Sequence, residues 1–217
     1  MFDVPDGILD LLSNPLPIEP TPDPLQTPNG IKSIRMLRHD AKQRFLNMMK
    51  QETLSAVMDS LPATGEVLHV VSNGKFDFWT WVPVLIRLSG GKVEHLFAST
   101  WTLSRANANE MLRMLNAGDI GMVTLLTGEE FKSRETAVYG TLVEGLLKKH
   151  QRYMSCPNHA KVLLLRNSAT ATWLTVEGSA NFTSNPRIEN YVITNERSVF
   201  EFHHAWMEEI FSAAKTQ

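Results

Sequence analysis

The chain has 217 residues, of which 43% are hydrophobic and 20% are charged, and these values fit one globular domain, alone or with an appendage. The net charge of −2 excludes an overall basic field that would attract nucleic acid or anionic lipid. The single cysteine, Cys156, excludes an internal disulfide framework and a cysteine-rich zinc site. We interpret it as a buried thiol beside a strand, with a nucleophilic role as the alternative.

The first 60 residues differ in composition from the rest. Residues 1–31 contain five acids, no lysine or arginine, and seven of the eleven prolines. Proline lacks a backbone donor and disfavours helical geometry in the residue before it, so this acidic, proline-rich segment is predicted to be a disordered tail. Residues 32–60 place cations between apolar residues at roughly helical spacing and are predicted to form a basic amphipathic helix. No signal peptide is recognisable, and the longest apolar stretch, 78–86, is too short to span a bilayer, so we expect a cytoplasmic protein without a membrane partner.

Residues 61–217 are predicted to form one domain in which strands and helices first alternate and strands then follow one another. The expected strands are 65–74, 93–100, 120–128, 152–156, 159–167, 171–179 and 189–195. The expected helices are 76–91, 105–118 with Gly118 as its C-cap, 133–150 with Ser133 as its N-cap, and 198–215. This order predicts an α/β sandwich in which helices flank both faces of a mixed sheet.

Polar side chains with chemical potential gather between residues 158 and 190. His159 and Lys161 stand two apart at the predicted start of a strand and should therefore share one face. Ser179 and Asn181 follow the end of the next strand, and Glu189 opens the last one. If neighbouring strands align, all five side chains meet at one end of the sheet.

This set of groups suits phosphoryl transfer without a metal or another cofactor. The imidazole of His159 can attack phosphorus and form a covalent phosphohistidine. Lys161, Asn181 and Ser179 can donate hydrogen bonds to the phosphate oxygens, whose charge rises in the transition state. Glu189 can orient the imidazole that acts as general acid and favour its protonated form.

The motifs themselves are His159-Ala-Lys161, Gly178-Ser-Ala-Asn-Phe-Thr183 and Glu189-Asn190, in that order. Together they resemble the phospholipase D superfamily, and most closely its bacterial nucleases with a single HxK motif. The resemblance implies a phospholipase D-like sandwich and a phosphohistidine mechanism. The family motif is usually HxKxxxxD, and Arg166 stands where the acid is expected. In the family that acid is regarded as structural, so its loss leaves open both an active enzyme and a degenerate, non-catalytic copy.

The family builds its site from two HxK motifs that face each other. None of the other histidines of this chain is followed two residues later by lysine, so the resemblance implies a homodimer with one composite site. The leading hypothesis is a metal-independent nuclease that acts on DNA, because six cations lie in 32–50 and six in 148–187, against only Asp40 and Glu177. The alternatives are a phospholipase-type hydrolase and a non-catalytic, dimeric binding module.

Other aromatic and histidine residues receive structural interpretations. Four tryptophans are predicted to belong to the core rather than to platforms that stack nucleobases, namely Trp79, Trp81, Trp101 and Trp173. His203 and His204 lack a third nearby ligand, so a metal site is not expected there. Arg134, near the start of the predicted helix 133–150, either directs a phosphate to the helix N-terminus or belongs to an ordinary surface helix.

Overall fold

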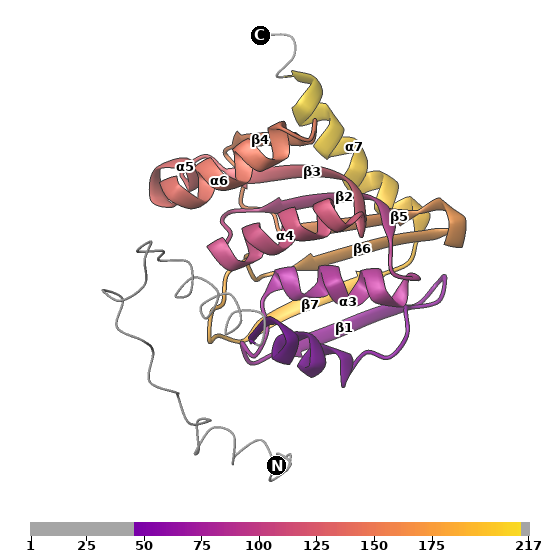
Figure 1. The fold of residues 1–217 in the computed structure, drawn as a ribbon. Helices are drawn as coiled ribbons and strands as arrows, with labels where there is room; N and C mark the ends of the chain where they lie inside the picture. Colours follow the sequence, from indigo (N-terminus) through magenta and orange to yellow (C-terminus); the bar gives the residue numbers. More distant parts are fainter. Residues whose placement is uncertain (1–45, 214–217) are drawn as a thin grey trace, which may run out of the picture. The chain divides into compact units, whose positions relative to one another are not determined.

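The computed structural model describes residues 46–213 (Figure 1). The predicted tail 1–31 and the first part of the predicted basic helix lie outside these residues. Residues 46–55 form a helix, as the sequence predicts for them. None of the helices in the described part of the chain is long and apolar enough to cross a membrane.

Within residues 46–213, seven strands form a single mixed sheet in the order β1-β7-β6-β5-β2-β3-β4. They are β1 (Val67–Ser72), β2 (Val93–Thr100), β3 (Ile120–Gly128), β4 (Arg152–Cys156), β5 (Val162–Asn167), β6 (Thr172–Gly178) and β7 (Glu189–Thr194). The β2, β3 and β4 strands run parallel to one another, and every other neighbouring pair is antiparallel. The antiparallel pairing of β5 with β6 and of β6 with β7 follows from the short connections between them, because parallel neighbours need a longer crossover.

Helices cover both faces of this sheet (Figure 1). They are α3 (Trp81–Leu88) after a 3₁₀ turn η1 (Phe78–Thr80), α4 (Arg105–Ala117), α5 (Phe131–Arg134), α6 (Thr136–Leu147) and α7 (Arg197–Ala213), with a second 3₁₀ turn η2 (Ser168–Thr170). One core joins α3, α4 and α6 to Leu96 and Ala98, while a second core joins α7 to Phe97 of the same strand. Alternate residues of β2 thus face different helices, which is why this central strand is apolar almost throughout. The predicted fold class is confirmed.

The predicted helix over 133–150 is wrong in its outline. The chain forms two helices, α5 and α6, which are separated at Glu135 (φ −126°, ψ 47°). Ser133 lies inside α5, where its hydroxyl donates to the carbonyl of Glu130, so it does not cap a helix N-terminus. The predicted Gly118 cap of α4 is confirmed, because this glycine adopts the left-handed conformation at φ 77°.

The strand predicted from residue 159 begins only at Val162. Asn158 explains the delay, because its side chain accepts from the amide of Ala160 and donates to the hydroxyl of Ser99. That hydroxyl in turn donates to the carbonyl of Ala160. Side chains therefore replace the ladder partners of residues 158–160, and His159 lies in a loop rather than on a strand.

Candidate active site

The predicted motif residues approach one another where the central strands of the sheet begin or end. This end of the strands is here called the site edge. The β5 strand begins there, β6 ends there and β7 begins there, with Val162 opposite Glu177 and Gly178 opposite Tyr191. The amide of Gly178 also donates to the carbonyl of Lys161 at 3.1 Å. Antiparallel pairing thus carries Lys161, Ser179 and Glu189 to the same end of three adjacent strands.

His159 and Lys161 are in direct contact at this edge. The Lys161 ammonium lies 3.0 Å from His159 Nδ1 and donates to the His159 carbonyl oxygen at 2.7 Å. The imidazole is exposed, whereas Lys161 is buried, with only 7% of its surface exposed. The two side chains are therefore joined by this direct contact. They do not share one face of a strand, as the sequence predicted, because the strand begins only at Val162.

Burial lowers the pKa of Lys161, and the nearby Glu189 carboxylate opposes this shift. A lysine in this position loses part of its hydration shell and gains from any anion that comes close. Lys161 therefore offers a buried donor beside the exposed imidazole of His159.

The contact with Lys161 also decides which nitrogen of His159 carries a proton. An ammonium group only donates hydrogen bonds, so Nδ1 accepts, and the proton of a neutral imidazole is then on Nε2. In this neutral state the Nε2–H group can donate a hydrogen bond, while Nδ1 is occupied by Lys161 and is not free to attack. Movement of the Lys161 ammonium to a bound anion would free Nδ1 and allow the other tautomer.

Ser179 and Glu189 form a pair of their own. The Ser179 hydroxyl donates to the Glu189 carboxylate and accepts from the amide of Asn190 at 3.1 Å. Within the part of the chain that the structure describes, no hydrogen bond joins Glu189 to His159. The Ser179 proton is committed to Glu189, so Ser179 donates to a phosphate only if this pair opens.

Asn181 contacts the loop that follows β2. Its Oδ1 accepts from the amide of Trp101 at 3.3 Å, and its backbone carbonyl accepts from the amide of Phe78 at 3.3 Å. It does not line the cavity described below. The structure therefore gives Asn181 a clear part in holding the loop of Trp101.

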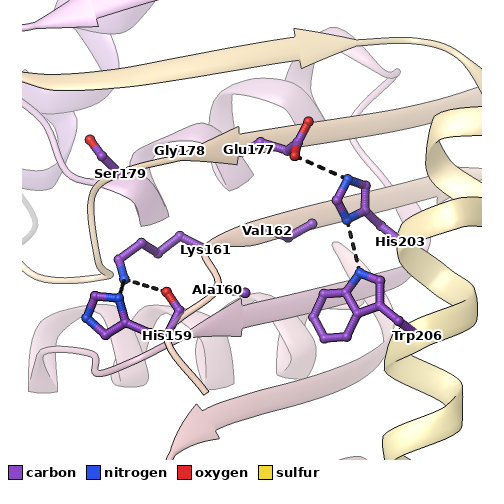
Figure 2. Close-up of a pocket in the computed structure, with 9 residues that line it drawn as sticks. All are labelled: His159, Ala160, Lys161, Val162, Glu177, Gly178, Ser179, His203 and Trp206. Atoms are coloured by element: carbon purple, nitrogen blue, oxygen red, sulfur yellow. Dashed lines mark hydrogen bonds and ion pairs between the residues drawn. The ribbon is translucent and has the colours of Figure 1, made fainter. Parts of the chain in front are cut away.

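An open cavity of about 540 Å³ lies along β5 and β6 beside the HxK pair. His159, Lys161 and Ser179 line one side (Figure 2). The opposite side is formed by Glu177, His203 and Trp206, the last two of which belong to α7 (Figure 2). Sequence reasoning did not find this second wall. The spacing of His203 and Trp206 puts both on one helix face, but the sequence near them does not indicate that they lie beside Glu177.

Trp101 is a further residue that sequence reasoning assigned differently, because it is only partly buried. Its ring centroid lies 5.8 Å from that of His159, and its Nε1 donates to Glu130 at 2.7 Å. The guanidinium of Arg134 covers the ring at 5.0 Å. A Cβ at Gly128 would lie 2.4 Å from Trp101 Cδ1, so a glycine is needed for this packing. Trp101 is thus a neighbour of the site, while Trp79 and Trp81 are buried as predicted.

The remaining residues singled out in the sequence lie outside this group. Burial raises the pKa of the Cys156 thiol, which keeps it protonated and disfavours the nucleophilic role. Arg166 lies near the other end of β5, about 16 Å of extended chain from Lys161. It pairs there with Glu94 at 3.4 Å. The departure from the family motif is therefore remote from the HxK pair.

No family model and no curated protein matches the sequence. Solved structures with a similar fold include a phospholipase D family member, Nuc, from Salmonella typhimurium, at 15% identity and a TM-score of 0.49 over 68% of this chain and 94% of that one. NucT from Helicobacter pylori gives 12% identity and a TM-score of 0.48 over 68% and 97% of the two chains. TrmBL2, an archaeal chromatin protein, gives 11% identity and a TM-score of 0.47 over 84% and 64%. At TM-scores below 0.5 these likenesses carry no inference about substrate or mechanism.

Proposed function

We propose that this chain is a metal-independent phosphodiesterase that cleaves DNA through a phosphohistidine at His159. The observation that carries the proposal is the contact between an exposed imidazole and a buried ammonium at the side of an open cavity. The HxK, GSxN and EN motifs meet at this edge in the order typical of the phospholipase D nucleases. A phosphodiester bound beside Lys161 would bring phosphorus within reach of His159.

The first chemical step would be attack of an unprotonated imidazole nitrogen of His159 on phosphorus. The nitrogen–phosphorus bond forms while the bond to the leaving oxygen breaks, and that oxygen needs a proton. Lys161 would move from His159 Nδ1 to the phosphate oxygens, where it stabilises the charge that develops. Glu189 would support this step by keeping Lys161 protonated, since its carboxylate raises the pKa of that lysine.

The proton for the leaving oxygen would come from a protonated His159 imidazole of a second copy in a homodimer, which thereby becomes neutral. In an isologous dimer the two copies of one residue can face each other across the twofold axis. The second His159 would then take a proton from water, whose oxygen attacks phosphorus and breaks the nitrogen–phosphorus bond. The exposure of His159 leaves it accessible to such a partner.

In the structure, fewer cations are available to contact a nucleic-acid substrate than the cation count of the sequence suggests. Within 148–187, Lys148 pairs with Glu144, Arg152 with Glu208 and Arg166 with Glu94. These pairs remove half of the six cations from the pool available to phosphates. Phosphate contacts would therefore come from Lys161 and from exposed cations such as Arg134 and Arg187.

The decisive experiment measures phosphodiester cleavage in excess EDTA with a plasmid, an oligonucleotide and bis(4-nitrophenyl) phosphate as substrates. His159→Ala should lower turnover by at least about 10³-fold, because it removes the nucleophile. His69→Ala, at an exposed histidine on β1, is the matched control and should keep wild-type turnover. Trapping of an acid-labile phosphohistidine during turnover would identify the intermediate. A folded dimer that cleaves no substrate would instead favour the binding module, and preferential cleavage of a phospholipid would favour the phospholipase-type hydrolase.

A further inference from the structure

The cavity beside the HxK pair extends beyond the groups that the proposed chemistry uses. Its floor is made by the start of β5 and the end of β6, with Ala160, Val162 and Gly178 among its lining residues (Figure 2). Its volume of about 540 Å³ falls within the range of about 300–1,000 Å³ that is usual for small-molecule sites. A phosphate alone would leave most of this space unfilled.

The far wall of the cavity is a hydrogen-bonded chain of three side chains. Trp206 Nε1 donates to His203 Nδ1 at 3.1 Å, and His203 Nε2 lies 3.3 Å from Glu177 Oε1 (Figure 2). Because Nδ1 accepts from the indole, Nε2 carries the imidazole proton and donates it to Glu177. Both nitrogens of His203 are therefore engaged, and this histidine is not available as a second acid or base.

This series of hydrogen bonds orients Glu177 as an acceptor. Its Oε1 is fixed by His203, while its side chain remains 47% exposed at the cavity wall. A carboxylate has about four lone-pair sites, so one donor from His203 leaves capacity for a ligand. Trp206 has already used its only donor on His203 and offers the cavity an apolar aromatic surface.

We propose that this half of the cavity is a nucleobase subsite, in which one base lies against Trp206 and donates its exocyclic amino group to Glu177. The proposal rests on the phosphodiesterase function above, because it assigns the base to a nucleotide that flanks the scissile phosphate. Cytosine, adenine and guanine carry such an amino group, whereas uracil and thymine present a carbonyl oxygen that a carboxylate repels. A base in this position has left its stack, so single-stranded substrates are favoured.

The subsite is tested by titrating dCMP and dUMP into the full-length protein and measuring binding by calorimetry in EDTA. The two bases share one ring and differ in the amino group that cytosine alone carries. Wild-type protein should bind dCMP about tenfold more tightly, which corresponds to about 1.4 kcal/mol. Glu177→Gln keeps the size of the side chain and removes its charge, and it should abolish this preference. Glu209→Gln, at an exposed position on α7 outside the cavity, should retain it.

The aromatic wall is tested with Trp206→Leu, which should weaken binding of both nucleotides about tenfold. A thermal melt of each variant checks that it is folded. Equal binding of dCMP and dUMP by the wild type, or a cytosine preference that survives Glu177→Gln, overturns the nucleobase subsite. Turnover of bis(4-nitrophenyl) phosphate, which has no nucleobase, separately tests the phosphodiesterase proposal. Nucleotide binding therefore decides the subsite even if that turnover is absent.

Discussion

The two ends of strand β5 lie at the site edge and at the opposite end of the sheet, here called the far edge. Their polar side chains are arranged differently. At the site edge, His159 is exposed and contacts Lys161, and an open cavity adjoins the pair. At the far edge, where β5 ends, Arg166 pairs with Glu94, which also accepts from the amide and hydroxyl of Ser168 at 3.0 and 2.9 Å.

Asn167 completes the far edge, because its Nδ2 donates to two backbone carbonyls, of Ser89 and Lys92, at 3.3 and 3.0 Å. The polar groups of this edge thus hold strand ends and loops to one another. At the site edge, by contrast, the HxK pair adjoins an open cavity, and the His159 imidazole is exposed there. Because Arg166 stands at the far edge, we expect its replacement of the motif acid to affect the architecture of β5 rather than the proposed chemistry.

After the loss expected for His159→Ala, the largest effect is expected at the site edge, from Lys161→Ala. Loss of one donor to a developing phosphate charge should lower kcat by about 10²–10³-fold, measured with bis(4-nitrophenyl) phosphate. Lys161→Arg should not restore turnover, because the position is only 7% exposed and the planar guanidinium needs more room. Lys149→Ala, at an exposed lysine, is the matched control. A loss below about tenfold in Lys161→Ala would remove this lysine from the proposed mechanism.

The next effect concerns stability near the far edge, where His95 pairs with Arg166 across the β2–β5 ladder. Burial, with a further contribution from Arg166, lowers the pKa of His95 to about 4, whereas the unfolded imidazole titrates near 6.5. Between pH 4 and pH 6.5, His95 is protonated in the unfolded chain and neutral in the folded one. The free energy of unfolding should therefore fall as the pH drops from about 6.5 to about 4, by at most about 3 kcal/mol.

Urea unfolding of the wild type and of His95→Gln over this pH range measures that contribution. The variant cannot gain the proton, so its free energy of unfolding should depend less steeply on pH. His69→Gln, at an exposed histidine, should keep the wild-type slope. Identical slopes for the wild type and His95→Gln would show that His95 titrates alike in the folded and unfolded chains.

A smaller effect is expected from Glu189→Gln, on the pH dependence of turnover. Burial lowers the pKa of Lys161, and the Glu189 carboxylate raises it. Removing that charge should lower the lysine pKa further, so the alkaline limb of the kcat/KM profile should move to lower pH. A profile measured across the alkaline range tests this, with Glu209→Gln as the control. An unchanged limb would mean that Glu189 does not act through Lys161.

The smallest effect is expected from Arg166→Ala at the far edge. Turnover should remain within about threefold of the wild type, because Arg166 lies about 16 Å of extended chain from Lys161. Its pairing with Glu94 is near the surface, where ion pairs contribute little to stability, so the urea midpoint should change only slightly. A large loss of turnover in a fully folded variant would break the distinction between the two edges.

The sequence by itself determined most strands and the edge at which the motifs meet. Both rest on local information: apolar runs bounded by turns define β2 and β3, and the short connections from β5 to β6 and from β6 to β7 favour antiparallel neighbours. The ends of such strands then alternate between two edges, which brings Lys161, Ser179 and Glu189 together. The motifs themselves were visible because their residues are close in the chain.

Only the tertiary structure decided the contacts that cross between distant segments. Asn158 bonds to Ser99 and moves His159 off the strand, and Glu177 meets His203 only because α7 packs across β5 and β6. Two of the ion pairs that engage cations in 148–187, Arg152 with Glu208 and Arg166 with Glu94, likewise depend on partners from other elements. Each of these contacts joins side chains whose local sequence contains no trace of the other, so their geometry follows from packing rather than from pattern.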